Sequence, residues 1–270
     1  HNNLGVVFMA QGSLDEAVAS FRRAVSLQPE HPNAHYNLGN ALKEQGRLAE
    51  AVASYRQAVR RTPNYAQLHS NLGDTLQSQG RLDEAIASYR QAIGLNPGLV
   101  EVHYNLGDAL REQGQLDEAV ASYRRAIELK PDFAQAYNNL ANVLKNQDRL
   151  DEATEVCRQA ISIKPDFAEA HSNLGAILQK QDRLEEALAH YRQAISIKPD
   201  FAEAYSNQGD ALHALGRQDE AVASCRRALE IRPDSAETCN ILGNALRELG
   251  RLDEAAAYGR QALALKARSA

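Results

Sequence analysis

The sequence predicts an all-α solenoid in which antiparallel helix pairs stack on one another. Three observations predict it: a 34-residue period along the whole chain, helical spacing of apolar residues within each period, and glycine or proline where helices should end. The period is plainest in an alanine column, which consists of Ala17, Ala51, Ala85, Ala119, Ala153, Ala187, Ala221 and Ala255. A strict long period indicates units that bury their apolar faces only against their neighbours.

Residues 32 to 65 show how one unit is expected to fold. Pro32 suits a helix start, because its missing N–H would be unpaired there in any case. Apolar residues then recur at helical spacing as far as Gly46, which is expected to end the helix in a left-handed turn. A second helix follows with Tyr55 on its buried face, and Pro63 ends the unit. The unit is therefore an antiparallel pair of helices.

Small residues control how closely the paired helices approach. Gly39 and Ala51 are expected to let the backbones come together, while Tyr55 fills the space between them. In two units Asp148 and Asp182 replace the turn glycine. Aspartate visits the left-handed region more readily than most residues, so the turn is expected to persist there.

The recurring elements Asn-Leu-Gly, Gly-Arg-Leu-Asp-Glu-Ala, Tyr-Arg-Gln-Ala and Pro resemble the tetratricopeptide repeat (TPR) family over the whole chain. The resemblance implies a right-handed superhelix, with the first helix of each pair lining a concave groove and the second facing outwards. Residues 165–175 look similar to the repeat arm of protein O-linked N-acetylglucosamine transferase-like proteins. We expect one solenoid, incomplete at both ends and cut from a longer protein. Its eight repeats are 1–31, 32–65, 66–99, 100–133, 134–167, 168–201, 202–235 and 236–270.

One polar column is expected to face the groove. At about 100° per residue, Leu38 and Leu42 define the buried side of their helix and Asn40 points nearly opposite. A side-chain amide can both donate and accept, which suits the C=O and N–H groups of an extended peptide. The predicted peptide-binding residues are Asn37, Asn71, Asn105, Asn139, Asn173 and Asn207, with Asn40, Asp74, Asp108 and Asn142 beside them. The lining also includes Gln77, Arg111, Lys145, Gln179 and Arg247. The alternative is that the asparagines serve helix-pair construction or hydration.

Three functions compete at this point. The first is a protein-interaction scaffold that binds an extended peptide or partner segment in its groove. The second is the substrate-recruiting arm of an O-GlcNAc transferase-like enzyme whose catalytic domain lies outside this chain. The third, a chaperone adaptor that clamps a terminal carboxylate, is rejected because positions such as Glu101, Glu169 and Glu203 would repel the carboxylate.

Composition argues against several other classes. The net charge of −5 is mild and interleaved, which does not favour a nucleic-acid partner. We interpret the arginine column on the second helices as a solvated face with acidic partners, as where Arg124 precedes Glu128 by one turn. No apolar run approaches the roughly 18 residues that a membrane span needs. The sequence shows no catalytic constellation, no cofactor motif and no metal-ligand spacing. We therefore expect no enzyme activity from this chain.

Three cysteines, Cys157, Cys225 and Cys239, bear on the compartment. Two of them occupy the column of buried aromatics and are interpreted as apolar substitutes; only Cys225 and Cys239 could form a disulfide. A reducing, cytoplasmic setting is therefore expected. Around Leu263 and Leu265 the last helix is expected to leave an uncapped apolar face, which would permit end-to-end self-association.

Overall fold

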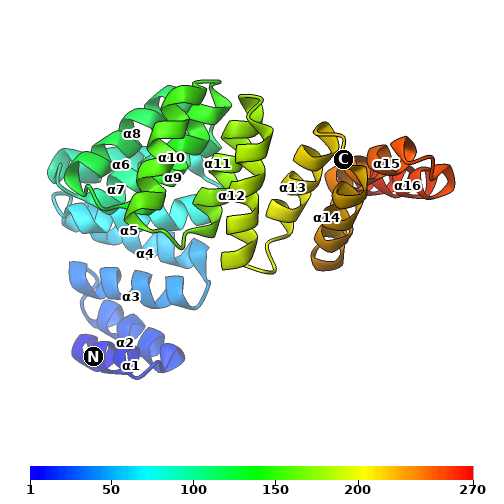
Figure 1. The fold of residues 1–270 in the computed structure, drawn as a ribbon. Coiled ribbons are helices and arrows are strands. Elements are labelled where there is room, and N and C mark those ends of the chain that lie inside the picture. The colour runs from blue at the N-terminus through cyan, green and yellow to red at the C-terminus, as the bar shows by residue number, and fades with distance from the viewer. Residues whose placement is uncertain (270) are drawn as a thin grey trace. The chain divides into compact units, whose positions relative to one another are not determined.

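The protein is entirely helical in a computed structural model that describes residues 1–269. Sixteen helices and no strand are present over those residues (Figure 1), which confirms the predicted fold class. The chain divides into two compact units, His1–Pro131 and Asp132–Ala270. Within each unit, helices that are consecutive in sequence pack against each other as antiparallel pairs.

The helices have nearly constant lengths. The first unit contains α1 (Asn2–Ala10), α2 (Leu14–Leu27), α3 (Pro32–Glu44), α4 (Leu48–Arg61), α5 (Ala66–Ser78), α6 (Leu82–Leu95), α7 (Val100–Glu112) and α8 (Leu116–Leu129). The second contains α9 (Ala134–Asn146), α10 (Leu150–Ile163), α11 (Ala168–Lys180), α12 (Leu184–Ile197), α13 (Ala202–Ala214), α14 (Gln218–Ile231), α15 (Ala236–Glu248) and α16 (Leu252–Ser269). Odd-numbered helices are the first of each pair and even-numbered helices the second.

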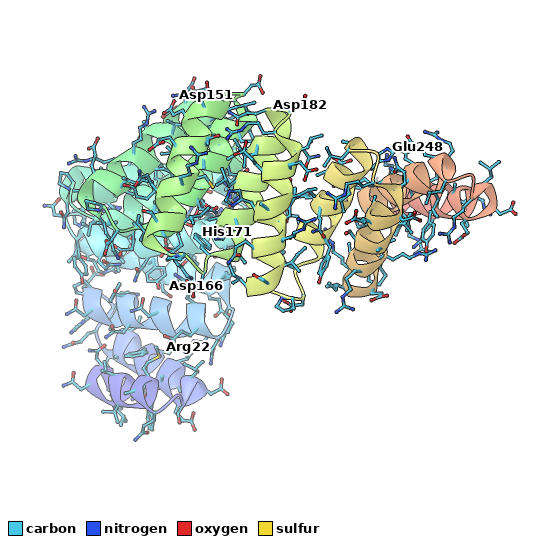
Figure 2. The ribbon with its side chains drawn as sticks, in the orientation of Figure 1. Arg22, Asp151, Asp166, His171, Asp182 and Glu248 are labelled. Atoms are coloured by element: carbon cyan, nitrogen blue, oxygen red, sulfur yellow. The ribbon has the colours of Figure 1, made fainter. Side chains whose placement is uncertain are left out.

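The turn inside each pair has the expected left-handed residue. Gly46 has φ of 73°, and the N–H of Arg47 after it donates to the carbonyl of Leu42 at 2.9 Å. This bond satisfies a carbonyl that the end of α3 would otherwise leave unpaired. Asp148 and Asp182, both with φ of 61°, occupy the same place in their repeats (Figure 2 labels Asp182), as predicted.

The contact between a glycine on the first helix and a tyrosine ring on the second sets the distance between paired helices. A Cβ added to Gly39 would lie 2.6 Å from the ring of Tyr55, which is fully buried. Three further pairs repeat this contact: Gly73 with Tyr89, Gly107 with Tyr123, and Gly175 with Tyr191. In the fifth repeat both residues differ together, because Ala141 stands at the glycine position and Cys157 at the tyrosine position. The thiol of Cys157 donates instead to the carbonyl of Ala170, at 3.2 Å.

Buried histidines anchor the start of several first helices. The Nε2 of His35 donates to the carbonyl of Pro29 at 2.8 Å, and that of His171 (labelled in Figure 2) donates to the carbonyl of Pro165 at 3.0 Å. Equivalent bonds join His69 to Pro63 and His103 to Pro97. The histidine column therefore serves packing, and each member lies six residues after the proline whose carbonyl it binds.

Candidate functional site

The first helices form one continuous side of each unit. Besides packing on its own partner, α1 contacts α3 and α5 contacts α7, while α9, α11, α13 and α15 contact one another in sequence. The described second helices make no comparable contact with each other within a unit. The first helices are thus closer together, which places them on the inner side. We call the surface they form in each unit the inner face.

The asparagine column joins successive first helices. In four of its members the amide nitrogen donates to the first helix of the preceding repeat. These bonds join Asn37 to Asn2, Asn71 to Asn40 and Tyr36, Asn105 to Asp74, and Asn173 to Asn138, with N···O distances of 2.8–3.2 Å. Much of the donor capacity of the column is therefore used inside the protein.

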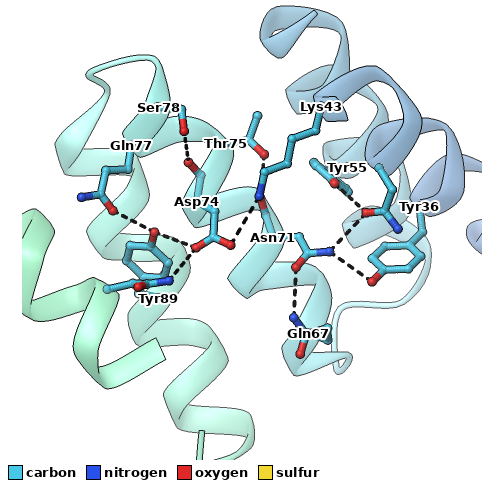
Figure 3. A network of polar contacts seen from close by, with 12 residues as sticks. Tyr36, Lys43, Tyr55, Gln67, Asn71, Asp74, Thr75, Gln77, Ser78 and Tyr89 are labelled. Atoms are coloured by element: carbon cyan, nitrogen blue, oxygen red, sulfur yellow. Dashed lines mark hydrogen bonds and ion pairs between the residues drawn. The ribbon is translucent and has the colours of Figure 1, made fainter. Parts of the chain in front are cut away.

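The network around Asn71 shows this most fully (Figure 3). Its Nδ2 donates to Tyr36 at 3.1 Å and to Oδ1 of Asn40 at 3.2 Å, so both amide hydrogens are engaged. The same Asn40 oxygen accepts the hydroxyl hydrogen of Tyr55 at 2.7 Å. Gln67 donates to the Asn71 oxygen at 3.0 Å. One lone pair of that oxygen remains for a ligand.

Asp74 is the counterpart of Asn40 one repeat later and has a similar structural role. Its Oδ1 accepts from Tyr89 at 2.9 Å and from Asn105 at 3.0 Å, and its Oδ2 lies 3.5 Å from the Lys43 ammonium (Figure 3). Burial, and after it the Asp74 carboxylate, raises the pKa of Tyr89. The column of Asn40 and Asp74 was expected to point away from the core. Instead, Asn40 and Asp74 accept hydrogen bonds from the hydroxyl groups of buried tyrosines.

The remaining predicted site residues lie on the same inner faces. Asp108 accepts from Tyr123 at 2.6 Å. Asn139 and Asn142 are half-buried on α9, and Asn207 is half-buried on α13. The sequence carried a signal for three of the tyrosine bonds that was not recognised: Tyr55, Tyr89 and Tyr123 each follow an acceptor by 15 residues.

A hollow of about 470 Å³ lies on the inner face of the first unit. It is open to solvent and is bordered by four helices, α1, α3, α4 and α5. Its lining residues are Met9, Asn40, Lys43, Glu44, Tyr55 and Asn71. Two predicted site residues, Asn40 and Asn71, therefore border one recess.

The outer surface carries a ladder of ion pairs. Arg22 contacts Glu50 of the next repeat at 2.7 Å, and Arg56 pairs with Glu84 in the same way. Arg90 with Glu118 and Arg226 with Glu254 continue the pattern. These contacts support the interpretation of the arginine column as a paired, solvated face. Glu50 and Glu84 lie in the first turns of their helices and also link repeats. In the fourth repeat Arg125 contacts Glu128 at 2.8 Å.

The three cysteines are buried and free. Burial raises the pKa of the Cys157 and Cys225 thiols to about 12. Across residues 1–269, no three His, Cys, Asp or Glu side chains are grouped so as to hold a metal ion. In that same part of the chain, no helix combines the length and hydropathy needed to cross a membrane.

Two family models cover almost all of the chain. Residues 64–270 match the TPR model of the cilia and flagella-associated protein 70 C-terminal domain, and residues 2–66 match a tetratricopeptide repeat model. The chain belongs to the TPR family. None of the curated proteins matches it at a significant level.

Solved structures give the same family. YrrB, described as a TPR protein with an unusual peptide-binding site, is 26% identical with a TM-score of 0.61, over 73% of this chain and 97% of YrrB. MamA is 30% identical with a TM-score of 0.56, over 62% of this chain and 97% of MamA. Cut9–Hcn1 of the APC/C is 16% identical with a TM-score of 0.69, over 97% of this chain and 52% of that chain, and shares the fold alone. These matches do not support the O-GlcNAc transferase-like subtype.

Proposed function

We propose that this TPR chain is a protein-interaction scaffold whose inner face binds an extended peptide. The observation that carries the proposal is the orientation of the asparagine column. Because the amide nitrogens of Asn37, Asn71, Asn105 and Asn173 donate to the preceding repeat, their oxygens are held in fixed positions. These half-buried oxygens are suited to accept hydrogen bonds from the N–H groups of a peptide backbone.

The spacing of the column agrees with an extended ligand. Packed helices lie about 8–10 Å apart, and an extended chain advances about 3.3–3.6 Å per residue. One step of the column therefore corresponds to about three peptide residues. The hollow beside Asn71 offers room for a peptide side chain between two such steps. The similarity to YrrB, described as having a peptide-binding site, further favours this function.

The test is a binding measurement with a fluorescein-labelled random nonapeptide library. We expect the combined substitution Asn37→Ala, Asn71→Ala and Asn105→Ala to weaken binding by at least about tenfold, since each lost bond contributes about 1 kcal/mol. The control is Gln91→Ala with Gln193→Ala, because both glutamines are exposed on second helices. N-methylation of a selected peptide, which removes backbone donors, should weaken binding to the wild type. If affinity is unchanged in the triple variant while its helicity is preserved, the proposal is wrong.

The alternative of a glycosyltransferase recruiting arm rests on the asparagine column and on the resemblance of residues 165–175. The sequence that flanks this chain in its full-length gene product tests it. A glycosyltransferase domain there would support the alternative, and a kinase, secretion or membrane domain would exclude it. Either result is compatible with peptide binding on the inner face.

End-to-end self-association is a separate proposal. Leu263 on α16 is 70% exposed, and Leu265 beside it is half-buried. We expect Leu263→Gln to reduce any dimer seen in sedimentation velocity at high protein concentration. Leu27→Gln, at an exposed leucine of α2, is the comparison for the other end. A monomeric wild-type protein would exclude the proposal.

A further inference from the structure

The sixth repeat contains two histidines that face each other from its two helices. The Nδ1 atoms of His171 on α11 and His190 on α12 are 3.2 Å apart, and the ring centroids are 5.5 Å apart. The difference between these distances is close to the width of an imidazole ring, so each Nδ1 lies on the side of its ring that faces the other. His171 is 7% exposed and His190 is half-buried. The two rings therefore form a direct contact between paired helices.

The positions of the protons in this pair follow from a third group. The Nε2 of His171 lies 3.0 Å from the carbonyl oxygen of Pro165, which can only accept, so this nitrogen carries a hydrogen. A neutral imidazole has one N–H, and the Nδ1 of His171 is therefore an acceptor. The Nδ1 of His190 must then be the donor. The neutral pair has one arrangement of protons, and that arrangement satisfies both nitrogens between the rings.

Protonation of His171 is incompatible with this arrangement. Because its Nε2 already carries a hydrogen, the added proton would go to Nδ1 and face the N–H of His190, so that two donors would meet without an acceptor. The Nε2 of His190 can still take one proton. The intact pair therefore holds at most one added proton, whereas the two histidines of the unfolded chain each take one.

The charges around the pair do not remove this restriction. Burial lowers the pKa of His190 most, His171 and Arg158 on α10 lower it further, and Glu186 on α12 raises it. The Glu186 carboxylate is itself engaged by Arg183, at 2.7 Å. The one acidic group that acts on His190 is thus already paired with an arginine.

We propose that the His171–His190 pair is a pH-sensitive contact of the sixth repeat, which holds α11 against α12 near neutral pH and releases it in acid. Below the ordinary histidine pKa of about 6.5, the unfolded repeat binds more protons than the folded one, so the stability of the repeat falls as the pH drops. α11 also carries Asn173, whose amide donates to Asn138 on α9 at 2.8 Å. Loosening of α11 would therefore reach the inner face. The inference does not depend on the proposed function, because it concerns the protein without a ligand.

Other repeats contain the first histidine without the second. The position 19 residues after His35, His69 and His103 is held by Ser54, Ser88 and Ser122. Ser88 donates its hydroxyl hydrogen to the carbonyl of Glu84 in its own helix, at 2.8 Å. His69 still donates to the carbonyl of Pro63, at 2.7 Å. The third repeat therefore has the histidine–proline bond but no histidine pair, and it is a matched control within the same molecule.

The experiment is hydrogen exchange of the backbone amides at pH 7.5 and pH 5.0, with protection factors corrected for the intrinsic exchange rate at each pH. A difference of one bound proton changes an opening equilibrium by about tenfold per pH unit. We expect the protection of residues 168–201 to fall by at least about tenfold at pH 5.0, and that of residues 66–99 to change much less. His190→Ser, which introduces the residue of most other repeats, should remove the effect from the sixth repeat. Ser88→His should introduce it into the third.

The ratio of protection at the two pH values is compared within each variant, so a change of packing that is independent of pH does not affect the result. Equal ratios for the third and sixth repeats of the wild type would overturn the proposal. A pH effect that persists in His190→Ser would overturn it too, and so would greater protection of residues 168–201 at pH 5.0 than at pH 7.5. Loss of the effect in His190→Ser together with its appearance in Ser88→His would establish the pair as the cause.

Discussion

The hydroxyl group of Tyr55 donates a 2.7 Å hydrogen bond to Oδ1 of Asn40, which lies 15 residues earlier on the partner helix. The tyrosine ring is completely buried, so this bond connects the core to the inner face. The same oxygen accepts from Asn71 of the following repeat. Packing within a repeat and contact between repeats are therefore coupled through one atom, and substitutions there should affect both stability and the binding surface.

Removing a tyrosine hydroxyl should lower the free energy of unfolding more where its hydrogen-bond acceptor is charged. Tyr89 donates to the Asp74 carboxylate, whereas Tyr191 donates to the neutral amide of Gln179. We expect Tyr89→Phe to lower the free energy of unfolding by about 1.5–3 kcal/mol and Tyr191→Phe by about 1 kcal/mol. Urea denaturation followed by circular dichroism measures both. Equal losses would contradict the role assigned to Asp74.

The same tyrosines predict a loss of stability at high pH. Burial raises the pKa of Tyr55, Tyr89, Tyr123 and Tyr191 above the ordinary value of 10.0. The unfolded chain therefore loses these protons first as the pH rises through 10, and the folded state is destabilised from there upwards. We expect the urea midpoint to fall between pH 9 and pH 11. Tyr89→Phe should show a smaller fall, and an equal one would argue against this cause.

The glycine–tyrosine contact predicts a paired substitution effect. Gly107→Ala would place a methyl group 2.7 Å from the ring of Tyr123. We expect this substitution to lower the free energy of unfolding by about 1–3 kcal/mol. In the fifth repeat, Cys157→Tyr alone should be similarly unfavourable, because Ala141 occupies the space that the ring needs. Adding Ala141→Gly should recover most of the loss. A double variant no more stable than Cys157→Tyr would show that the two positions are independent.

Two exposed glycines should respond to alanine in opposite directions. Gly80 has φ of 71°, so Gly80→Ala forces alanine into the left-handed region and should destabilise by about 1 kcal/mol. Gly94 lies within α6 with no atom within 4 Å of an added Cβ. Gly94→Ala should stabilise by about 0.5–1 kcal/mol. Thermal unfolding of the two variants beside the wild type checks both signs, and shifts of the same sign would contradict the argument.

Much of the fold could be predicted because its determinants are local. Gly46 and its aspartate substitutes fix the turns, and Gly39 was expected to let the paired helices approach while Tyr55 fills the space between them. The polar columns were harder, because a helical wheel gives the direction of Asn40 from its own axis but not where the partner helix places the Tyr55 hydroxyl.

The contacts between repeats recur at constant sequence separations. The hydrogen bonds from the side-chain amides of Asn71 to Asn40 and of Asn105 to Asp74 span 31 residues. The ion pairs of Arg22 and Arg90 on the outer surface span 28 residues. A gene duplication or deletion of one whole repeat keeps every such separation intact, whereas an insertion or deletion of a single residue within a repeat changes every separation that spans it. The protein can therefore lengthen or shorten its inner face by whole repeats during evolution, and each added repeat brings an independent choice of residue at each inner-face position.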